Sequence, residues 1–325
     1  MRARKSCAVV VIAAVLATGC GADEPDNGGA EVNAESAAAE TAIVSSLGRV
    51  VEVDASDGSI IRQLLRMGDV DAAIGVPLDL AVDRERSILY VERAGDCASA
   101  IMSAPLVGGS DPLELVADDQ VGTSTPRVSP DGSHLAYRLD TNVDDDACND
   151  TDTIVVRDLE NGAERRYALG AERIEWLGEQ ALLVERPNSS VPEVRRLDLD
   201  HAEGEIEFDS LPSVATGALL DAATHAGVTT IAVREPCSDP TISYCDAPLL
   251  IVDATNGGPQ TRFRPPAGEW IATAELPDNG SVVEVMAGLQ ELDGDELPDT
   301  RQRRLVRARG DDVTVLLPDF SYVDW

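Results

Sequence analysis

The sequence predicts an all-β fold built from a repeated four-stranded unit, and three observations support this. From Thr41 onward, short runs rich in β-branched and apolar residues alternate with Gly, Asp and Asn turns, as antiparallel strands do. No long amphipathic helix pattern interrupts these runs. A turn of the form D-x-x-[DN]-G recurs at Asp54–Gly58, Asp158–Gly162 and Asp253–Gly257, about two units apart each time. In it, the Asp is expected to bond to turn amides and the Gly to take a left-handed conformation.

The clearest unit covers residues 125–169. It begins with TPRVSPDGSHLAYRLD, which predicts two strands joined by the turn Ser129–Gly132. It ends with TIVVRDLENGAERRYAL, which predicts two strands joined at Asn161-Gly162. We expect Asn-Gly to supply the pair of positive φ angles that a tight hairpin needs. Four antiparallel strands of this length make one blade of a β-propeller.

The same spacing predicts six blades, with opening strands near residues 78, 125, 173, 217, 270 and 320. Five of these blades are complete in chain order, whereas the sixth is divided. Phe320–Trp325 reads as an opening strand, and residues 41–66 offer three strands without an opening one. We therefore expect residues 41–325 to form a six-bladed β-propeller closed by pairing of the C-terminal strand with the N-terminal blade. Such closure would satisfy strand edges that otherwise invite aggregation.

The run SPDGSHLAYR at residues 129–138 resembles the TolB-type, WD-like propeller repeat, in which SPDG commonly precedes an apolar strand. Only one of the six units keeps these letters, and the others keep the spacing. The resemblance implies the fold and says little about function, because propellers serve as scaffolds, binders and enzymes alike. The SPDG segment itself is explained by its role as a β-turn.

The N-terminal segment predicts export. Met1–Lys5 is basic, and Ala8–Ala17 is an apolar run of ten residues. Such a run is too short to span a bilayer, which needs about 20 residues, and is typical of a signal peptide. Leu16–Cys20 resembles a bacterial lipoprotein lipobox, although Ala17 stands where the aliphatic residue is usual and Leu16 lies one step early. An ordinary secretory signal, with Cys20 incidental, is the alternative.

The lipobox resemblance implies that residues 1–19 are a signal peptide and that Cys20 carries diacylglycerol. The protein would then be anchored in the cell membrane on its extracytoplasmic face. Residues 20–40 are acidic and rich in small residues, which predicts a lipidated, flexible tether that precedes the propeller.

The charge balance excludes two classes of partner. The chain has 26 Lys and Arg against 59 Asp and Glu, a formal net charge of −33. This argues against a nucleic-acid binder that neutralises phosphates, and equally against a polybasic membrane-surface module.

The cysteines predict two disulfides. Cys7 would leave with the signal peptide and Cys20 would be lipidated. An even number of remaining cysteines in an exported protein favours disulfides over free thiols, which are the alternative. Two of the four lie in equivalent loops of neighbouring blades, and the other two share one loop. The expected pairs are Cys97–Cys148 and Cys237–Cys245.

Two loops are strongly acidic, at residues 140–152 and 291–299. In the first, oxygen ligands at alternate positions, Asp140, Asn142, Asp144 and Asp146, are of a kind that suits Ca²⁺. However, Asp145 stands where an EF-hand-like loop has Gly, and Thr151 where it has Glu. A solvated acidic rim is therefore the favoured interpretation, and a Ca²⁺ site is the weaker one.

No GxSxG, HExxH or P-loop motif is present in the sequence. The first hypothesis is therefore a membrane-anchored, non-catalytic propeller that binds an envelope protein or a small ligand, with no certain cofactor. The alternative is a Ca²⁺-dependent hydrolase or lactonase. Acids that would face the central channel, such as Asp79, Glu175 and Asp324, keep this alternative open.

Overall fold

The computed structural model describes residues of the segment Ala38–Trp325. The described residues are 41–324, apart from residues 47, 67–76, 94–98, 108–111, 116–121, 141–150, 187–192, 201–207, 211–216, 227, 240–244, 254–258, 278–283, 292–302, 310–311 and 319–321. No helix in these ranges is both long and apolar enough to cross a membrane.

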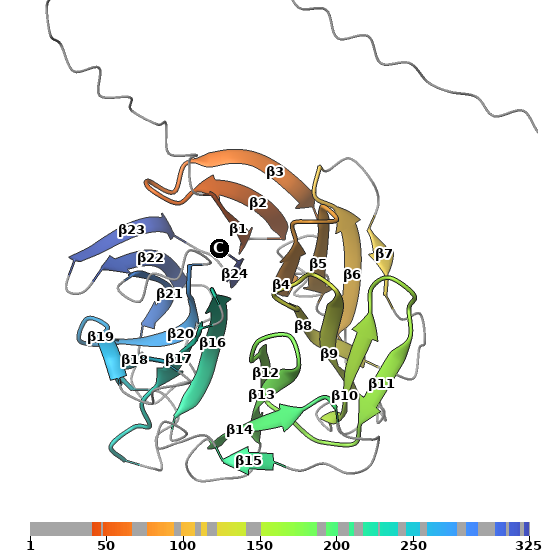
Figure 1. Ribbon diagram of the computed structural model, residues 1–325. Coiled ribbons are helices and arrows are strands. Elements are labelled where there is room, and N and C mark those ends of the chain that lie inside the picture. Colours follow the sequence, from red (N-terminus) through yellow and green to blue (C-terminus); the bar gives the residue numbers. More distant parts are fainter. Residues whose placement is uncertain are drawn as a thin grey trace, which may run out of the picture. The chain divides into compact units, whose positions relative to one another are not determined.

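The described strands form six antiparallel sheets of four strands each, here called blades 1–6 (Figure 1). Blade 1 contains β24 (Tyr322–Asp324), β1 (Thr41–Ser46), β2 (Arg49–Asp54) and β3 (Ile60–Arg66). Blade 2 contains β4 (Pro77–Asp83), β5 (Ile88–Arg93), β6 (Ala100–Pro105) and β7 (Leu113–Glu114). Blade 3 contains β8 (Gly122–Val128), β9 (His134–Asp140), β10 (Thr151–Asp158) and β11 (Glu164–Tyr167).

The other three blades repeat this order. Blade 4 contains β12 (Arg173–Trp176), β13 (Ala181–Arg186), β14 (Glu193–Asp198) and β15 (Phe208–Ser210). Blade 5 contains β16 (Ala218–His225), β17 (Val228–Arg234), β18 (Leu249–Asp253) and β19 (Pro259–Phe263). Blade 6 contains β20 (Glu269–Glu275), β21 (Glu284–Glu291), β22 (Arg303–Arg309) and β23 (Asp312–Pro318).

The first strand of each blade lies toward a common centre (Figure 1). Strand β4 contacts β8, β8 contacts β12, β12 contacts β16, and β16 contacts β20. Strand β24 contacts both β20 and β4, and its residues pair with β1, Val323 opposite Val44. This arrangement is consistent with a six-bladed β-propeller, and each opening strand begins within three residues of its predicted position.

Two of the three D-x-x-[DN]-G turns hold as the sequence predicts, with one correction, whereas residues 254–258 of the third lie outside the described residues. Asp54 Oδ1 accepts the Ser56 amide at 2.8 Å, and Asp158 Oδ1 accepts the Glu160 amide at 2.8 Å. Gly58 and Gly162 have φ of 73° and 75°. The expected pair of positive φ angles at Asn161-Gly162 is wrong, because only Gly162 has one. The Gly162 amide bonds to the Asp158 carbonyl at 2.9 Å, and this longer loop needs a left-handed residue only at its end.

Polar side chains connect successive blades at one recurring position, near the end of the second strand. Each reaches the backbone that enters or forms the first strand of the next blade. A carboxylate meets an amide and a guanidinium meets a carbonyl, so backbone groups are satisfied at the junctions, and the two glutamate contacts are buried. The four pairs are Glu92 with Thr125 N (2.9 Å), Arg138 with Glu172 O (2.9 Å), Glu185 with Leu219 N (2.8 Å) and Arg234 with Ile271 O (2.7 Å).

Apolar side chains fill the spaces between neighbouring blades. One cluster joins Tyr167 of blade 3 to Trp176 and Leu182 of blade 4. Another joins Val51 of blade 1 to Met286 of blade 6. Because each sheet buries its faces against its neighbours, removal of apolar surface from water stabilises the blades as a set.

Candidate functional site

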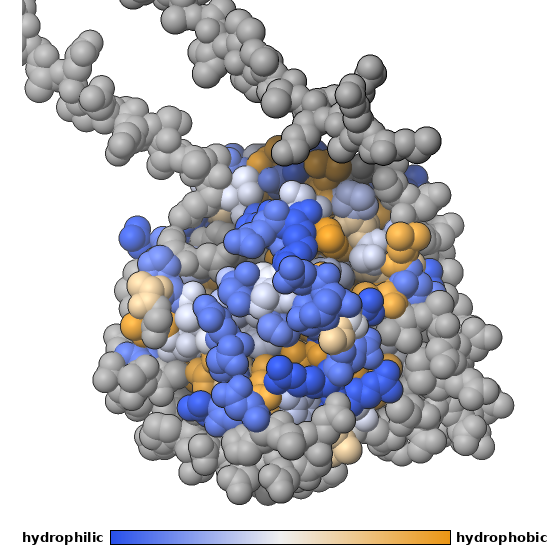
Figure 2. All heavy atoms as spheres, turned by 45° about the vertical axis from the view of Figure 1, so that its right-hand side comes forward, coloured by the Kyte–Doolittle hydropathy of each residue, from blue (hydrophilic) through white to orange (hydrophobic). Residues whose placement is uncertain are grey.

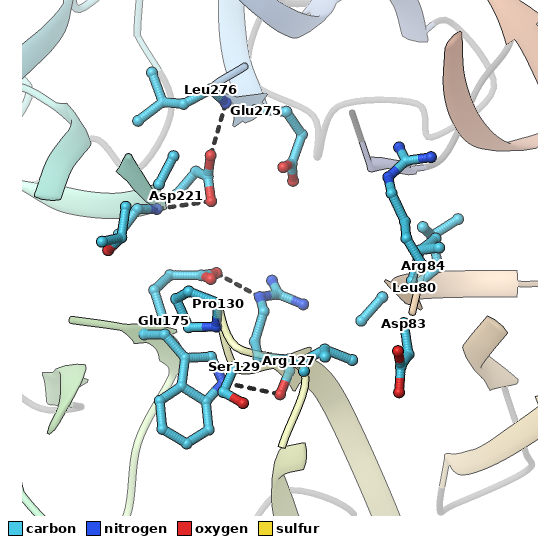
Figure 3. Close-up of a pocket in the computed structure, with 18 of the residues that line it drawn as sticks. Leu80, Asp83, Arg84, Arg127, Ser129, Pro130, Glu175, Asp221, Glu275 and Leu276 are labelled. Carbon is cyan, nitrogen blue, oxygen red and sulfur yellow. Dashed lines mark hydrogen bonds and ion pairs between the residues drawn. The ribbon is translucent and has the colours of Figure 1, made fainter. Parts of the chain in front are cut away.

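A cavity of about 390 Å³ lies among the first strands and the turns that follow them. Its walls come from β4, β8, β12, β16 and the end of β20 (Figure 3). The SPDG turn contributes Ser129, Pro130 and Gly132, and the turn after β4 contributes Arg84 and Glu85. The cavity therefore lies at the end of the blades that carries the turns between first and second strands.

Arg127 of β8 is the central charge of this site. Its Nη1 donates to both carboxylate oxygens of Asp79 of β4, at 3.0 and 3.1 Å. Its Nε donates to Glu175 Oε1 of β12, at 2.6 Å. Side-chain exposure is 9% for Arg127, 13% for Asp79 and 4% for Glu175. One guanidinium thus connects three blades in a nearly buried setting, where both charge pairs are little screened.

Local backbone geometry aims Arg127 into the site. The pairing of β8 with β9 shifts register between Ser124 and Arg127. Thr125 in this bulge has a φ of 54°, which is costly for a β-branched residue. The Glu92 carboxylate accepts the Thr125 amide, and the Trp176 indole donates to the Arg127 carbonyl at 3.0 Å. The side chains of two neighbouring blades therefore hold the bulge from both sides.

The cavity has more negative than positive groups. Figure 3 shows the carboxylates of Glu175, Asp221 and Glu275 around the same open space as Arg127. Asp221 accepts the Ala222 amide through Oδ1 and the Leu276 amide through Oδ2, each at 2.7 Å. Among the described residues, the charged side chains of the lining are five acids, Asp83, Glu85, Glu175, Asp221 and Glu275, and two cations, Arg84 and Arg127.

Two buried glutamates bind protons more tightly than usual. Burial raises the pKa of Glu175 to about 8; Arg127 opposes the rise, whereas the charges of Asp221 and Asp79 add to it. Burial also raises the pKa of Glu92 to about 7, with the Asp79 charge contributing in the same direction. A single guanidinium cannot neutralise several buried carboxylates, so part of the set retains protons near neutral pH.

The structure brings together two of the three acids expected to face the channel. Asp79 and Glu175 meet on Arg127, whereas the side chain of Asp324 lies outside the described residues. Cys237 and Cys245 form the expected disulfide, with their Cα atoms 5.8 Å apart. It lies in the connection between β17 and β18, at the opposite end of blade 5 from the cavity-side turn.

The other expected site residues are not described. Asp140 ends β9, but its side chain is outside the described part, as are its three expected companions in the acidic loop. Among the described residues, no three His, Cys, Asp or Glu side chains are grouped to hold a metal ion. Of the expected site residues, those wholly outside the described part of the chain are Cys20, Cys97, Cys148, Asn142, Asp144 and Asp146.

Sequence reasoning did not find Arg127, Glu92 or Asp221. Each of the two partners of Arg127 lies 48 residues away in the sequence, one in the preceding blade and one in the following blade. The repeat could have indicated Arg127 as a site residue, because Arg127 lies in an opening strand directly before the SPDG turn. The tripeptide Val-Glu-Arg also recurs at residues 91–93 and 184–186, and its Glu forms the blade junctions described above.

Comparison with known proteins shows likeness of fold. No known family model matches the sequence. No curated protein matches it. Among solved structures, hydrazine synthase of Kuenenia stuttgartiensis is similar over 80% of this chain and 71% of that chain, with 15% identity and a TM-score of 0.45.

Two further solved structures are similar at the same level. The β-propeller domain of Cps50 (Swd1) from Myceliophteria thermophila has 14% identity and a TM-score of 0.43, over 71% of this chain and 64% of that chain. An oligogalacturonate lyase in complex with manganese has 14% identity and a TM-score of 0.43, over 86% and 72%. At these identities the likeness says nothing of function.

Proposed function

We propose that the propeller is a non-catalytic binding module that receives a positively charged group of an envelope protein or small ligand in the central cavity. The observation that carries the proposal is the charge imbalance of a cavity of about 390 Å³, in which the described part of the lining has five acids and two arginines. Concave sites with a few converging polar groups are the usual places for ligands. Acids recessed between low-dielectric walls attract a cation more strongly than exposed ones.

The hydrogen bonds of the acids favour binding over chemistry. Both oxygens of Asp221 accept backbone amides, and both oxygens of Asp79 accept Arg127. The oxygens of these two carboxylates already accept protein donors, whereas a general base must accept a proton from a substrate. The proposed role is therefore recognition.

Photocrosslinking in intact cells tests the binding site. A photoreactive amino acid at Arg84, an exposed residue of the cavity lining, should capture a discrete partner that mass spectrometry identifies by a basic crosslinked segment or an amine. The same probe at Val107, 75% exposed beyond β6 of the same blade, is the matched control. Capture from position 84 and not from position 107 is expected. Equal capture from both positions, or none from position 84, would contradict the cavity as the binding site.

We also propose that the protein is a lipoprotein of the extracytoplasmic face of the cell membrane. The lipobox-like segment Leu16–Cys20 after an apolar run supports this, and residues 20–40 would serve as the tether. Lipidation at Cys20 would place two or more acyl chains in the bilayer, which is enough for stable anchoring.

Substitution of Cys20 tests the anchor. C20S should move the protein from the membrane fraction to the soluble fraction, or leave an uncleaved precursor, because serine offers no thiol for lipidation. C7S is the matched control, since Cys7 would leave with the signal peptide, and it should fractionate like the natural protein. Membrane retention of C20S at an unchanged size would refute the assignment.

Strand β24 supports a further proposal, that a TolB-type propeller is closed by its C-terminal strand. The strand pairs with β1 over Ile43–Ser45 and contacts the first strands of blades 2 and 6. In this proposal β24 serves as the opening strand of blade 1, and the SPDG turn at residues 129–132 reflects the TolB-type repeat.

Deletion of Ser321–Trp325 tests the closure. It removes the partner of Ile43–Ser45, leaves the β1 edge unpaired and exposes the ring to association with other chains. The expected loss of unfolding free energy is well beyond the roughly 0.5 kcal/mol of ordinary surface changes. Urea unfolding measures it, with deletion of Trp325 alone, which keeps β24, as the control. Matching unfolding midpoints for the intact and shortened chains would count against the closure.

A further inference from the structure

Four carboxyl groups from four strands are coupled around Arg127. Asp79 and Glu175 bond to it directly. Asp79 and Asp221 both act on Glu175 through their charges, and Asp79 also acts on Glu92. The cation Arg138 also acts on Glu92, and this glutamate accepts hydrogen bonds from the Thr125 amide and the Ser99 hydroxyl.

This cluster cannot be fully ionised at low energetic cost. Glu92 is 7% exposed, Glu175 3% and Asp221 8%. Several negative charges against one central guanidinium in such a setting repel one another, and little water screens them. Protonation of part of the set relieves the repulsion. Both oxygens of Asp79 and both of Asp221 accept N–H donors, whereas burial raises the pKa of Glu92 and the pKa of Glu175. Glu92 and Glu175 are therefore the members that take up protons.

Both of these glutamates hold the segment that presents Arg127. Glu175 accepts Arg127 Nε, and Glu92 accepts the amide of Thr125, two residues before Arg127. Thr125 has a left-handed φ of 54°, which persists only where its surroundings hold it. A carboxylate accepts a hydrogen bond more strongly than a neutral carboxyl group does, so proton uptake weakens both anchors of this segment.

We propose that the cluster around Arg127, which reaches the cavity through Arg127 and Glu175, is a proton-sensitive switch in which Glu92 and Glu175 take up protons as the medium becomes mildly acidic, loosening Arg127 and reducing the negative charge offered to a cationic partner. This inference rests on the proposed function and names the regulation of the same site. As the pH rises, each carboxyl O–H bond breaks and its proton passes to solvent. The carboxylates then re-form their bonds to Arg127 and Thr125, and the cavity attracts cations more strongly.

Trp176 reports on the switch without any ligand, because its indole donates to the Arg127 carbonyl. Its fluorescence in the natural protein should change with an apparent midpoint between about pH 6.5 and about pH 8.5. E92Q and E175Q should each shift that midpoint by roughly one unit or more, or remove it. W176F should abolish the change. E52Q, which alters a carboxylate paired with Arg62 on the outside of blade 1, should leave it intact.

Unfolding in urea gives a second readout that does not depend on Trp176. The folded-state pKa values of Glu92 and Glu175, about 7 and about 8, lie above the ordinary value of 4.5. Their stabilising effect is therefore complete below that ordinary value and is lost as pH rises through the folded-state values. The urea midpoint of the natural protein should fall from about pH 6 to about pH 9, and E92Q should flatten the fall. If E175Q fails to fold, E92Q carries the test alone.

Crosslinking from position 84 at two pH values connects the switch to binding. Capture should be roughly threefold or more stronger near pH 8.5 than near pH 6, since displacement of one proton changes affinity by up to about tenfold per pH unit. The difference should be smaller in E92Q, in which Glu175 still titrates. No fluorescence transition, a transition that survives both glutamine variants, or capture that is independent of pH would each overturn the switch. A normal titration with no capture at any pH would instead reject the proposed function and leave the titration of Glu92 and Glu175 standing.

Discussion

The contact of Arg127 with Asp79 and Glu175 is the interaction on which the centre of this molecule depends. The first strands of blades 2, 3 and 4 lie side by side, and each directs a charged side chain toward the centre. Without a cation, the buried carboxylates would repel one another and push these strands apart. With Arg127 in place, the same charges draw the three strands together and define the floor of the cavity. The ion pairs therefore both support the fold and shape the site.

Polar side chains also connect neighbouring blades at the blade junctions. A first strand that curves away from its neighbour leaves amides and carbonyls that no sheet partner can reach. Glutamates at two junctions and arginines at two others satisfy these groups, so the sign of the side chain follows the kind of backbone group it meets. The polar surface in Figure 2, where apolar side chains occur in small groups among hydrophilic ones, contrasts with these buried contacts. Charged side chains on the surface favour solubility, and those between the blades align neighbouring sheets.

The strands, most turns and one disulfide could be predicted from sequence because their causes are local. Alternation of apolar residues places a strand, and an Asp with a Gly four residues later places a turn, as at Asp54–Gly58. Cys237 and Cys245 lie in the same loop between two strands, so the predicted strand positions were enough to pair them. The tight-hairpin conformation expected at Asn161 was wrong because the carbonyl of Asp158 selects a longer loop.

The site could be predicted only in part, because its causes are not local. Asp79 and Glu175 were expected at the channel from their places in opening strands, yet nothing in their own segments indicates that they share a cation. That partner comes from a third strand, and its direction depends on Thr125 in a conformation that threonine rarely adopts. The raised pKa of Glu92 likewise arises from burial between blades, which a single segment does not reveal.

The hydrogen bond from Arg127 to Glu175, drawn in Figure 3, is the contact to test first. Substitution R127M, which keeps an unbranched side chain and removes the charge, should lower the free energy of unfolding by about 3–5 kcal/mol near pH 8, because buried carboxylates lose their cation. The exposed pair of Arg62 and Glu52 provides the control, and R62M should cost about 1 kcal/mol or less.

Addition of E175Q to R127M completes the measurement, because it removes one of the buried charges left without a partner. The double variant should regain part of the lost stability, and the difference from additivity gives the coupling energy between the two residues. The account predicts this partial recovery in urea unfolding. A cost of R127M no larger than that of R62M, or a double variant whose losses simply add, would contradict the claim that Arg127 holds the centre of the propeller together.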